Sequence, residues 1–283
     1  MHSAQFHIRN MRLDELDVAL RWAEREGWDP GLEDARCFYA ADPQGFFIGL
    51  CDTEPVACVS AVRYGAEFGF MGFYIVAPQF RGRGYGGKLA QAGLQHLAGC
   101  TIGLDGVVAQ QENYRSAGFQ WAYRNIRYRG TAILTEGGNG GILPLTQVPF
   151  ALLKAYDRLL FPAPRDAFLR AWINQSAATA LGAMVGENLL GYGVIRQCCE
   201  GYKIGPLFAD TAVVAEQLLR ALTAAVPAGS HFYLDIPEPN ADACALVQRH
   251  GMEKVFETAR MYLGEAPQLP LQRLYGVTSF ELG

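Results

Sequence analysis

The feature that most constrains the fold of this 283-residue sequence is that its second half repeats the first. In each half, hydrophobic periodicity predicts a helix, three strands, a helix, a strand, a short helix and a last strand, in that order. Gly72 and Gly118 in the first half are matched by Gly201 and Gly251 in the second at a nearly constant offset. The repeat indicates a duplicated fold, although any two α/β domains are alike at this level of detail.

Both halves are expected to be α/β domains of the α+β type, each built on a mixed sheet. Residues 131–149 are rich in glycine and contain Pro144 and Pro149, which is typical of a linker. The sequence therefore predicts an N-terminal domain over residues 1–130 and a C-terminal domain over residues 150–283. The expected strands are Phe46–Cys51, 56–64, Phe68–Val76, 101–108, 119–128, 178–185, 189–198, 202–208, 231–236 and 254–263. The expected helices are 11–26, 85–97, a short one near 114, 155–172, one capped by Asp210 and closed by Pro227, and 240–250.

Composition excludes several classes of protein. Half of the residues are hydrophobic and 18% are charged, so the chain can bury a large core. A net charge of −4 argues against a nucleic-acid partner held by a general basic surface. The sequence has no apolar run long enough to span a membrane and no secretory h-region, so no membrane association is expected. Seven cysteines without a C-x-x-C pair indicate reduced thiols in a cytoplasmic protein, and the scattered histidines predict no metal site.

Residues 73–89 run from a strand through a loop rich in glycine and arginine into a helix. Glycine lets a ligand approach the backbone closely, and the free N–H groups at a helix N-terminus attract phosphate oxygens. Arg81, Arg83 and Lys88 add positive charge. A dinucleotide-binding pattern does not fit, because no acidic residue follows at the required distance, and a P-loop does not fit, because Leu89 follows Lys88. The stretch predicts a phosphate-binding loop of another kind.

Two motifs resemble those of the GNAT (Gcn5-related) N-acetyltransferases. Arg81, Gly84 and Gly86 fill R-x-x-G-x-G after a strand, and residues 114–119 fill Y-x-x-x-G-F. The resemblance covers residues 6–130, and the second half is similar to the degenerate partner domain of tandem GNAT proteins. It implies two GNAT-like acyl-CoA N-acyltransferase domains, of which the second is degenerate, packed as a pseudo-dimer with the acceptor site between them.

The resemblance also implies acetyl-CoA as cosubstrate, with its pyrophosphate on the loop and its pantetheine arm between two splayed strands. The residues implied in binding it are Tyr74, Ile75, Val76, Arg81, Gly82, Arg83, Gly84, Tyr85, Gly86 and Asn113. Val107 departs from the family, which often has an asparagine there. In the second half Pro206 lacks an N–H group and Asp210 would repel phosphate, so a single acetyl-CoA site is expected, in the first half.

By the same resemblance, Tyr114 is the general acid that protonates the departing thiolate, and the alternative is that it only packs at a helix end. Glu67 stands where several relatives place a carboxylate that acts through water, and it could equally be a solvated residue at a strand start. Asp105 is the next candidate base. Asp235 and Glu238 lie at the matching strand end of the second half and are expected to line the acceptor cleft.

The sequence thus predicts an N-acetyltransferase that transfers an acetyl group directly from acetyl-CoA to a primary amine of a small acceptor. The alternative is a non-catalytic acyl-CoA-binding or sensing protein, which would need the loop and not the acid. Retention of both the loop and Tyr114 favours the enzyme. The expected partner is a small-molecule amine, the expected assembly a monomer or a homodimer, and the identity of the amine stays open.

Overall fold

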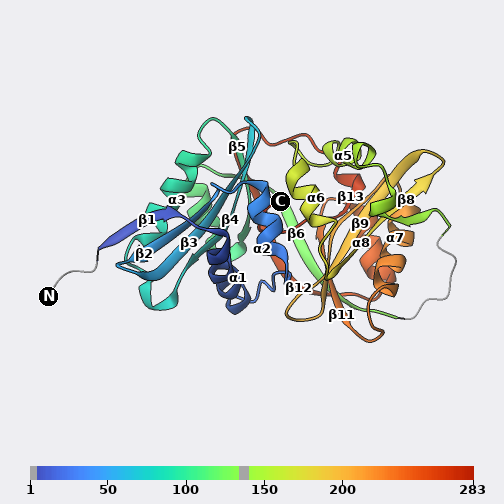
Figure 1. Cartoon of the computed structure of the whole chain (residues 1–283), viewed down its shortest axis with the longest axis horizontal. Coiled ribbons are helices and arrows are strands. Elements are labelled where there is room, and N and C mark those ends of the chain that lie inside the picture. The colour runs from blue at the N-terminus through green and yellow to red at the C-terminus, as the bar shows by residue number, and fades with distance from the viewer. Residues whose placement is uncertain (1–4, 134–139) are drawn as a thin grey trace.

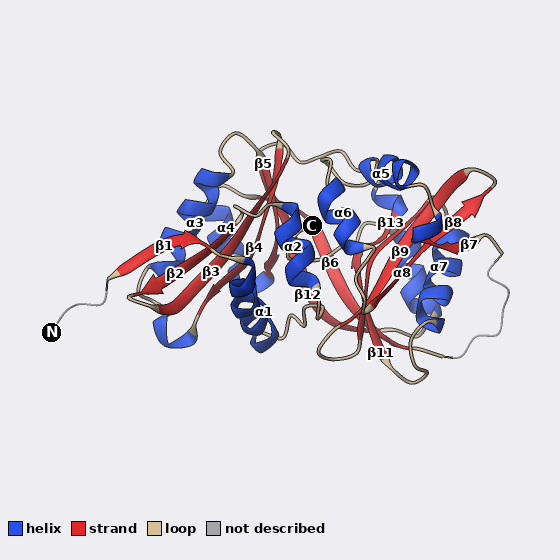
Figure 2. Cartoon of the chain, viewed as in Figure 1, coloured by secondary structure: helices blue, strands red, loops and turns tan. Residues whose placement is uncertain are grey.

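The computed structural model describes residues 5–133 and 140–283. Its strands form one continuous mixed sheet with helices against it, and the two halves lie side by side (Figures 1 and 2). The strands are β1 Phe6–Asn10, β2 Phe46–Cys51, β3 Glu54–Tyr64, β4 Phe68–Val76, β5 Thr101–Val107, β6 Gln120–Thr131, β7 Ile142–Pro144, β8 Ala178–Val185, β9 Asn188–Gln197, β10 Tyr202–Ala209, β11 His231–Pro237, β12 Glu253–Leu263 and β13 Leu274–Gly276. The helices are α1 Leu16–Arg25, α2 Asp34–Ala41, α3 Tyr85–His96, α4 Gln111–Ser116, α5 Phe150–Arg158, α6 Asp166–Trp172, α7 Ala212–Ala224 and α8 Ala241–Arg249.

The last strands of the two halves are exchanged. The sheet order is β1-β2-β3-β4-β5-β12-β6-β11-β10-β9-β8-β7, so β12 of the second half lies against β5, and β6 of the first half lies against β11. The two exchanged strands also pair with each other, antiparallel over most of their length. Each half therefore completes its sheet with a strand from the other. The domain boundaries at 130 and 150 stay a proposal, and residues 134–139 of the proposed linker lie outside the described part of the chain.

Buried ion pairs fix the register of the exchanged strands. Arg260 on β12 faces Asp105 on β5 with an Nη2–Oδ2 distance of 2.6 Å, and Arg127 on β6 faces Asp235 on β11 with an Nε–Oδ1 distance of 2.7 Å. The neighbouring carboxylates raise the pKa of both arginines against the opposing effect of burial. A register slip would leave these charges buried and unpaired, which is strongly unfavourable. Arg260 is itself buried between the two halves.

Most predicted elements are present with shifts of a few residues at their ends. The helix expected over 155–172 is instead two helices, α5 and α6, because Pro162 and Pro164 interrupt it. Thr211, not Asp210, caps α7 by accepting a hydrogen bond from the Val214 N–H group. Strands β1, β7 and β13 and helix α2 were not predicted.

A short strand fills the second half at the place where parallel strands separate. Strand β10 pairs with β11 only from Tyr202 to Ile204, and β13 then pairs with β10 at Leu207 and Phe208. The N–H group of Val277 also donates to the Asp235 carbonyl of β11. The gap between β10 and β11 is therefore occupied by the chain itself, which supports a single ligand site in the first half.

Beyond β13, residues 277–283, which we call the terminal segment, cross into the first half. The hydroxyl of Tyr64 donates to the Leu282 carbonyl oxygen at 3.1 Å. Gly72 on β4 lies directly under the segment, and a Cβ placed there would be 2.2 Å from the Glu281 carbonyl oxygen. Glycine is required at this crossing because two backbones touch.

We expect Gly72→Ala to destabilise the protein by about 1–3 kcal/mol, because the added methyl group must displace backbone atoms. Thermal unfolding measures the effect. The matched control is Gly87→Ala on α3, where a Cβ meets nothing within 4 Å. It should be neutral or stabilising, because alanine favours helix more than glycine does. Equal melting temperatures for Gly72→Ala and the unchanged protein would contradict the close crossing.

Candidate active site

The site begins where β4 and β5 stop pairing. Their parallel register runs from Phe68 opposite Thr101 to Met71 opposite Leu104 and ends there. Just beyond, β4 contains a bulge against β3, and Phe73 adopts a φ of 44°, in the left-handed region that non-glycine residues seldom occupy. The bulge bends β4 away from β5, as the resemblance implied, and opens a gap between the two strands.

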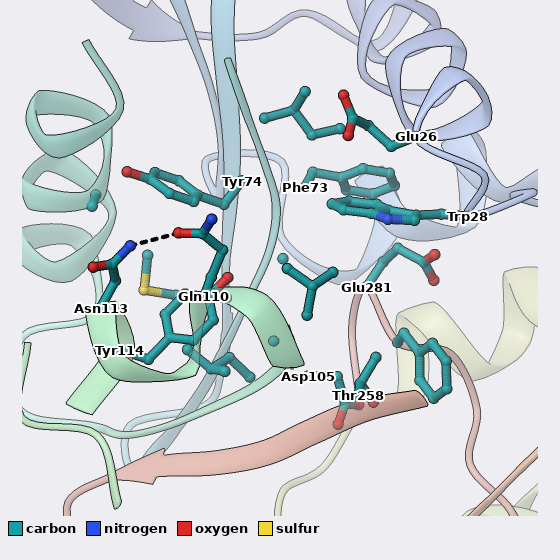
Figure 3. Close-up of a pocket in the computed structure, with 18 of the residues that line it drawn as sticks. Glu26, Trp28, Phe73, Tyr74, Asp105, Gln110, Asn113, Tyr114, Thr258 and Glu281 are labelled. Carbon is teal, nitrogen blue, oxygen red and sulfur yellow. Dashed lines mark hydrogen bonds between the residues drawn. The ribbon is translucent and has the colours of Figure 1, made fainter. Parts of the chain in front are cut away.

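A cavity of about 600 Å³ occupies this gap (Figure 3). Figure 3 shows Tyr74, Asn113 and Tyr114 on one side and Trp28, Phe73 and Glu281 on the other. Both halves contribute to the wall, since Phe256 and Thr258 come from β12 and Phe280 and Glu281 from the terminal segment. The first half contributes Glu26, Trp28, Met71, Gly72, Phe73, Tyr74, Ile75, Val76, Arg81, Ala90, Leu94, Leu104, Asp105, Gly106, Val107, Gln110, Asn113, Tyr114, Ala117 and Phe119.

The predicted phosphate loop lies between β4 and α3. Gly82 and Gly84 both have a φ of 78°, and a Cβ at either would meet nothing within 4 Å, so the space over the loop is open. Gly84 precedes α3, whose first turn has no acidic residue. The free N–H groups of this turn can therefore donate hydrogen bonds to a bound anion. Arg81 lines the cavity, where its Nε–H group donates to the Val76 carbonyl and its guanidinium pairs with Glu26.

Aromatic contacts hold the loop in place. Tyr85 stacks on Phe6 of β1 with ring centroids 4.4 Å apart, and the Arg83 guanidinium lies over the Phe80 ring. Gly86 leaves room for Tyr74, whose hydroxyl would be 2.5 Å from a Cβ at that position. Tyr74 lies on the cavity wall and Gly86 behind it, so the glycine of the motif also serves packing.

Tyr114 lies on α4 against the end of β5. Its ring packs on Gly106, where a Cβ would overlap the ring, so this glycine makes room for the tyrosine. Burial, with a smaller contribution from Tyr74, raises the pKa of Tyr114 to about 12. Asn113 lines the same wall, and its Nδ2–H group donates to Gln110 Oε1 at 2.5 Å. A protonated phenol thus faces the gap between the strands.

The carboxylates predicted from sequence are not gathered here. Glu67 is exposed in the turn before β4, at the far end of that strand, and it does not line the cavity. Asp105 does line it, but its carboxylate is held by Arg260 and by the Asn125 amide. Neither Asp235, paired with Arg127 inside the sheet, nor the exposed Glu238 is part of the wall.

Several of the wall residues that sequence reasoning missed come from distant parts of the chain. Trp28 follows α1, Phe256 and Thr258 lie on the exchanged strand β12, and Phe280 and Glu281 lie on the terminal segment. No local pattern marks the last two, because only the crossing over Gly72 brings them to the site.

Within residues 5–133 and 140–283, no group of three or more metal-ligating side chains is clustered. A search of the same residues found no helix with the length and apolar character needed to cross a membrane.

Comparison with known proteins identifies both halves. The model of the acetyltransferase (GNAT) family matches residues 13–119, and that of an acetyltransferase (GNAT) domain matches residues 153–276. Holothin acyltransferase of Pseudoalteromonas sp. (strain SANK 73390) is 33% identical over 271 residues, covering 96% of this chain and 92% of that protein. The uncharacterized N-acetyltransferase YitH of Bacillus subtilis (strain 168) is 23% identical over 270 residues, covering 93% and 94%.

Solved structures agree on the fold. A candidate acetyltransferase from Pyrococcus horikoshii superposes with a TM-score of 0.84 at 23% identity, covering 100% of this chain and 97% of that one. A tandem GNAT protein from the clavulanic acid biosynthesis pathway gives a TM-score of 0.63 at 12% identity, covering 92% and 100%. This chain therefore belongs to the GNAT family of N-acyltransferases and carries two GNAT domains in tandem.

Proposed function

We propose that the protein transfers an acetyl group from acetyl-CoA directly to a primary amine of a small acceptor, in the cavity between β4 and β5. The observation that carries the proposal is the position of Tyr114, a half-buried phenol with a raised pKa on the wall of the cavity between β4 and β5. In this arrangement the loop from Arg81 to Gly86 binds the pyrophosphate, and Tyr74, Ile75, Val76 and Asn113 contact the pantetheine arm.

The open edge of β4 beyond Met71 supports this placement of the thioester. Because β5 no longer pairs with β4 there, the edge of β4 around Ile75 and Val76 is open to a ligand that lies between the strands like a short strand itself, although the Val76 carbonyl already accepts from Arg81. An N–H group of the same strand can stabilise the negative charge that develops on the thioester carbonyl oxygen.

The chemistry requires one proton donor and one proton acceptor. The neutral amine attacks the thioester carbonyl, the C–N bond forms, and the C–S bond breaks. Tyr114 donates its proton to the departing thiolate, and a proton from the nitrogen restores the phenol. Holding both reactants in one cavity removes much of the entropic barrier to this bimolecular step.

A small acceptor is favoured by the shape of the site. The terminal segment and β12 line the cavity from the second half, and its volume of about 600 Å³ is shared by the acceptor and the thioester end of acetyl-CoA. The similarity to holothin acyltransferase, named for a single compound, agrees with a small-molecule acceptor.

The test is release of CoA thiol from acetyl-CoA in the presence of a panel of amines, with acetyl-CoA binding measured by calorimetry. Turnover on at least one amine supports the proposal. Saturable binding of acetyl-CoA without turnover on any amine would instead favour a sensing protein, and the absence of any CoA binding would overturn both.

We expect Tyr114→Phe to lower kcat by roughly 10- to 1,000-fold while acetyl-CoA affinity changes little, because only the proton on the phenol oxygen is removed. Thiol release and calorimetry measure the two quantities. Tyr202→Phe, a phenol lost outside the cavity wall, is the matched control and should leave both unchanged. An unaltered kcat in Tyr114→Phe would remove the acid role.

The pH dependence follows from the raised pKa of Tyr114. A general acid works in its protonated form, and burial moves its pKa from 10 to about 12, so its activity is lost only as the pH approaches 12. We therefore expect kcat to show no falling limb between roughly pH 7 and 10. A falling limb in that range that is present in the unchanged enzyme and absent from Tyr114→Phe would contradict this.

Gly84→Ala should weaken acetyl-CoA binding about tenfold or more, because a Cβ at a positive φ distorts the turn that presents the N–H groups to phosphate. Gly99→Ala is the matched control. Gly99 lies just after the C-terminal end of α3, with a φ of 85° and open space around it. An alanine there has similar backbone strain but is away from the loop. Calorimetry with acetyl-CoA separates them, and equal affinities in the two variants would argue against the loop as the phosphate site.

A further inference from the structure

Three carboxylates line the cavity, and they differ in how they are paired. Glu26 pairs with Arg81, and Asp105 pairs with Arg260. Glu281 is only 3% exposed, yet its buried Oε1 has no hydrogen-bond partner among the residues that the structure describes. A buried carboxylate oxygen without a partner is costly, so this atom points to a ligand that supplies a hydrogen-bond donor.

The backbone around Glu281 is rigidly placed. The terminal segment turns here, since the Gly283 N–H group donates to the Ser279 carbonyl and the Leu282 N–H group donates to the Ser279 hydroxyl. Gly72 lies in contact beneath the Glu281 backbone. These contacts fix the backbone that carries the Glu281 carboxylate, which limits the positions that the side chain can take.

Positive charge lies close to Glu281 and to the aromatic wall, where the Arg127 guanidinium is 4.8 Å from the Phe280 ring centroid. Arg127 and Arg196 are buried, and the Glu281 charge contributes to the raised pKa of each. Both arginines have carboxylate partners of their own, Asp235 and Asp34. The Nη atoms of Arg196 lack partners among the described residues, so balancing the charge of Arg196 is the competing, purely structural role for Glu281.

The surroundings of Glu281 are aromatic. Trp28, Phe73, Phe256 and Phe280 line the same cavity, and Figure 3 shows Glu281 on the same side as Trp28 and Phe73. Aromatic faces attract both flat apolar groups and cations. One further polar atom faces this wall without a partner among the described residues, the buried Oγ1 of Thr258.

We propose that Glu281 binds the ammonium group of the acceptor and takes a proton from it, and that the acceptor carries a single cationic nitrogen on a flat, mostly apolar body. This rests on the proposed function. The carboxylate removes one proton from R–NH₃⁺ to give the neutral amine, which forms the C–N bond while the thiolate leaves with the proton of Tyr114. The second nitrogen proton restores the phenol, and Glu281 later releases its proton to water. The net products of one turnover are therefore one amide, one CoA thiol and one proton.

The preference for one cationic nitrogen follows from the pairing of the carboxylates. Glu26 and Asp105 already hold arginines, so a second ammonium group would enter an aromatic cavity without an unpaired carboxylate among the residues described. Desolvating a charge without such a partner is unfavourable. Tryptamine and phenethylamine should therefore have kcat/KM values at least about tenfold above those of spermidine and glucosamine.

The experiment compares Glu281→Gln with the unchanged enzyme, using acetyl-CoA and tryptamine or phenethylamine. At pH 7 the variant should bind acetyl-CoA equally well but lose roughly 10²- to 10⁴-fold in kcat/KM. Raising the pH from 7 to 9 should restore about tenfold per unit in the variant alone, because a free amine of pKa roughly 10 then loses its proton in solution. Arg127 and Arg196 remain charged over that range. Glu187→Gln, at an exposed turn, is the control and should match the unchanged enzyme.

Each outcome decides a different point. No turnover by the unchanged enzyme on any amine counts against the proposed function itself. If the unchanged enzyme is active, two results overturn the role of Glu281 and favour the structural role beside Arg196. One is an undiminished kcat/KM in Glu281→Gln, and the other is a lowered kcat/KM, normalised to the number of acetyl-CoA sites, that does not recover as the pH is raised.

If Glu281→Gln does not fold, Glu281→Asp decides. It keeps the charge but shortens the reach, so kcat/KM should fall about tenfold or more at unchanged acetyl-CoA affinity, and an unchanged value overturns the proposal. Faster turnover of spermidine than of the flat amines overturns the acceptor class.

Discussion

The cavity exists because two parallel strands stop sharing hydrogen bonds part of the way along their length. The bulge at Phe73 turns β4 away from β5 after Met71, and every feature of the site uses the space that this creates. The phosphate loop follows the bent end of β4, Tyr114 packs on the free end of β5, and the terminal segment crosses β4 just before the bulge. A regular ladder at this point would leave no room for a thioester.

The loop before α3 and Tyr114 could be singled out from sequence, and the cavity residues of the terminal segment could not. The glycines and arginines after β4 and the tyrosine of α4 act through local geometry, such as a positive φ or a helix N-terminus, which a short stretch of sequence reveals. The sequence prediction missed the break between α5 and α6, although Pro162 and Pro164 lie at it. Glu281 was not, because no periodicity marks the terminal segment and its position depends on a distant glycine. Asp235 was expected in the cleft, but its register opposite Arg127 places it inside the sheet.

Duplication has given the two halves different tasks. In the second half β13 lies where the first half keeps its gap open, so the second half fills the corresponding gap with its own backbone. The chain then continues from β13 into the first half and provides part of the cavity wall there. The filled gap of one copy and the added wall residues of the other thus come from a single stretch of polypeptide.

The exchange of β6 and β12 has a consequence for how the protein is made. Strand β12, which pairs with β5, begins more than a hundred residues after β5 ends. Until the second half is translated, β5 and β6 therefore lack the neighbouring strands that they have in the folded protein. Exposed strand edges of this kind invite pairing with other molecules. We therefore expect the nascent chain to be most prone to aggregation before β12 has been translated. A chain truncated before β12 should yield an aggregation-prone fragment and not a folded, active domain.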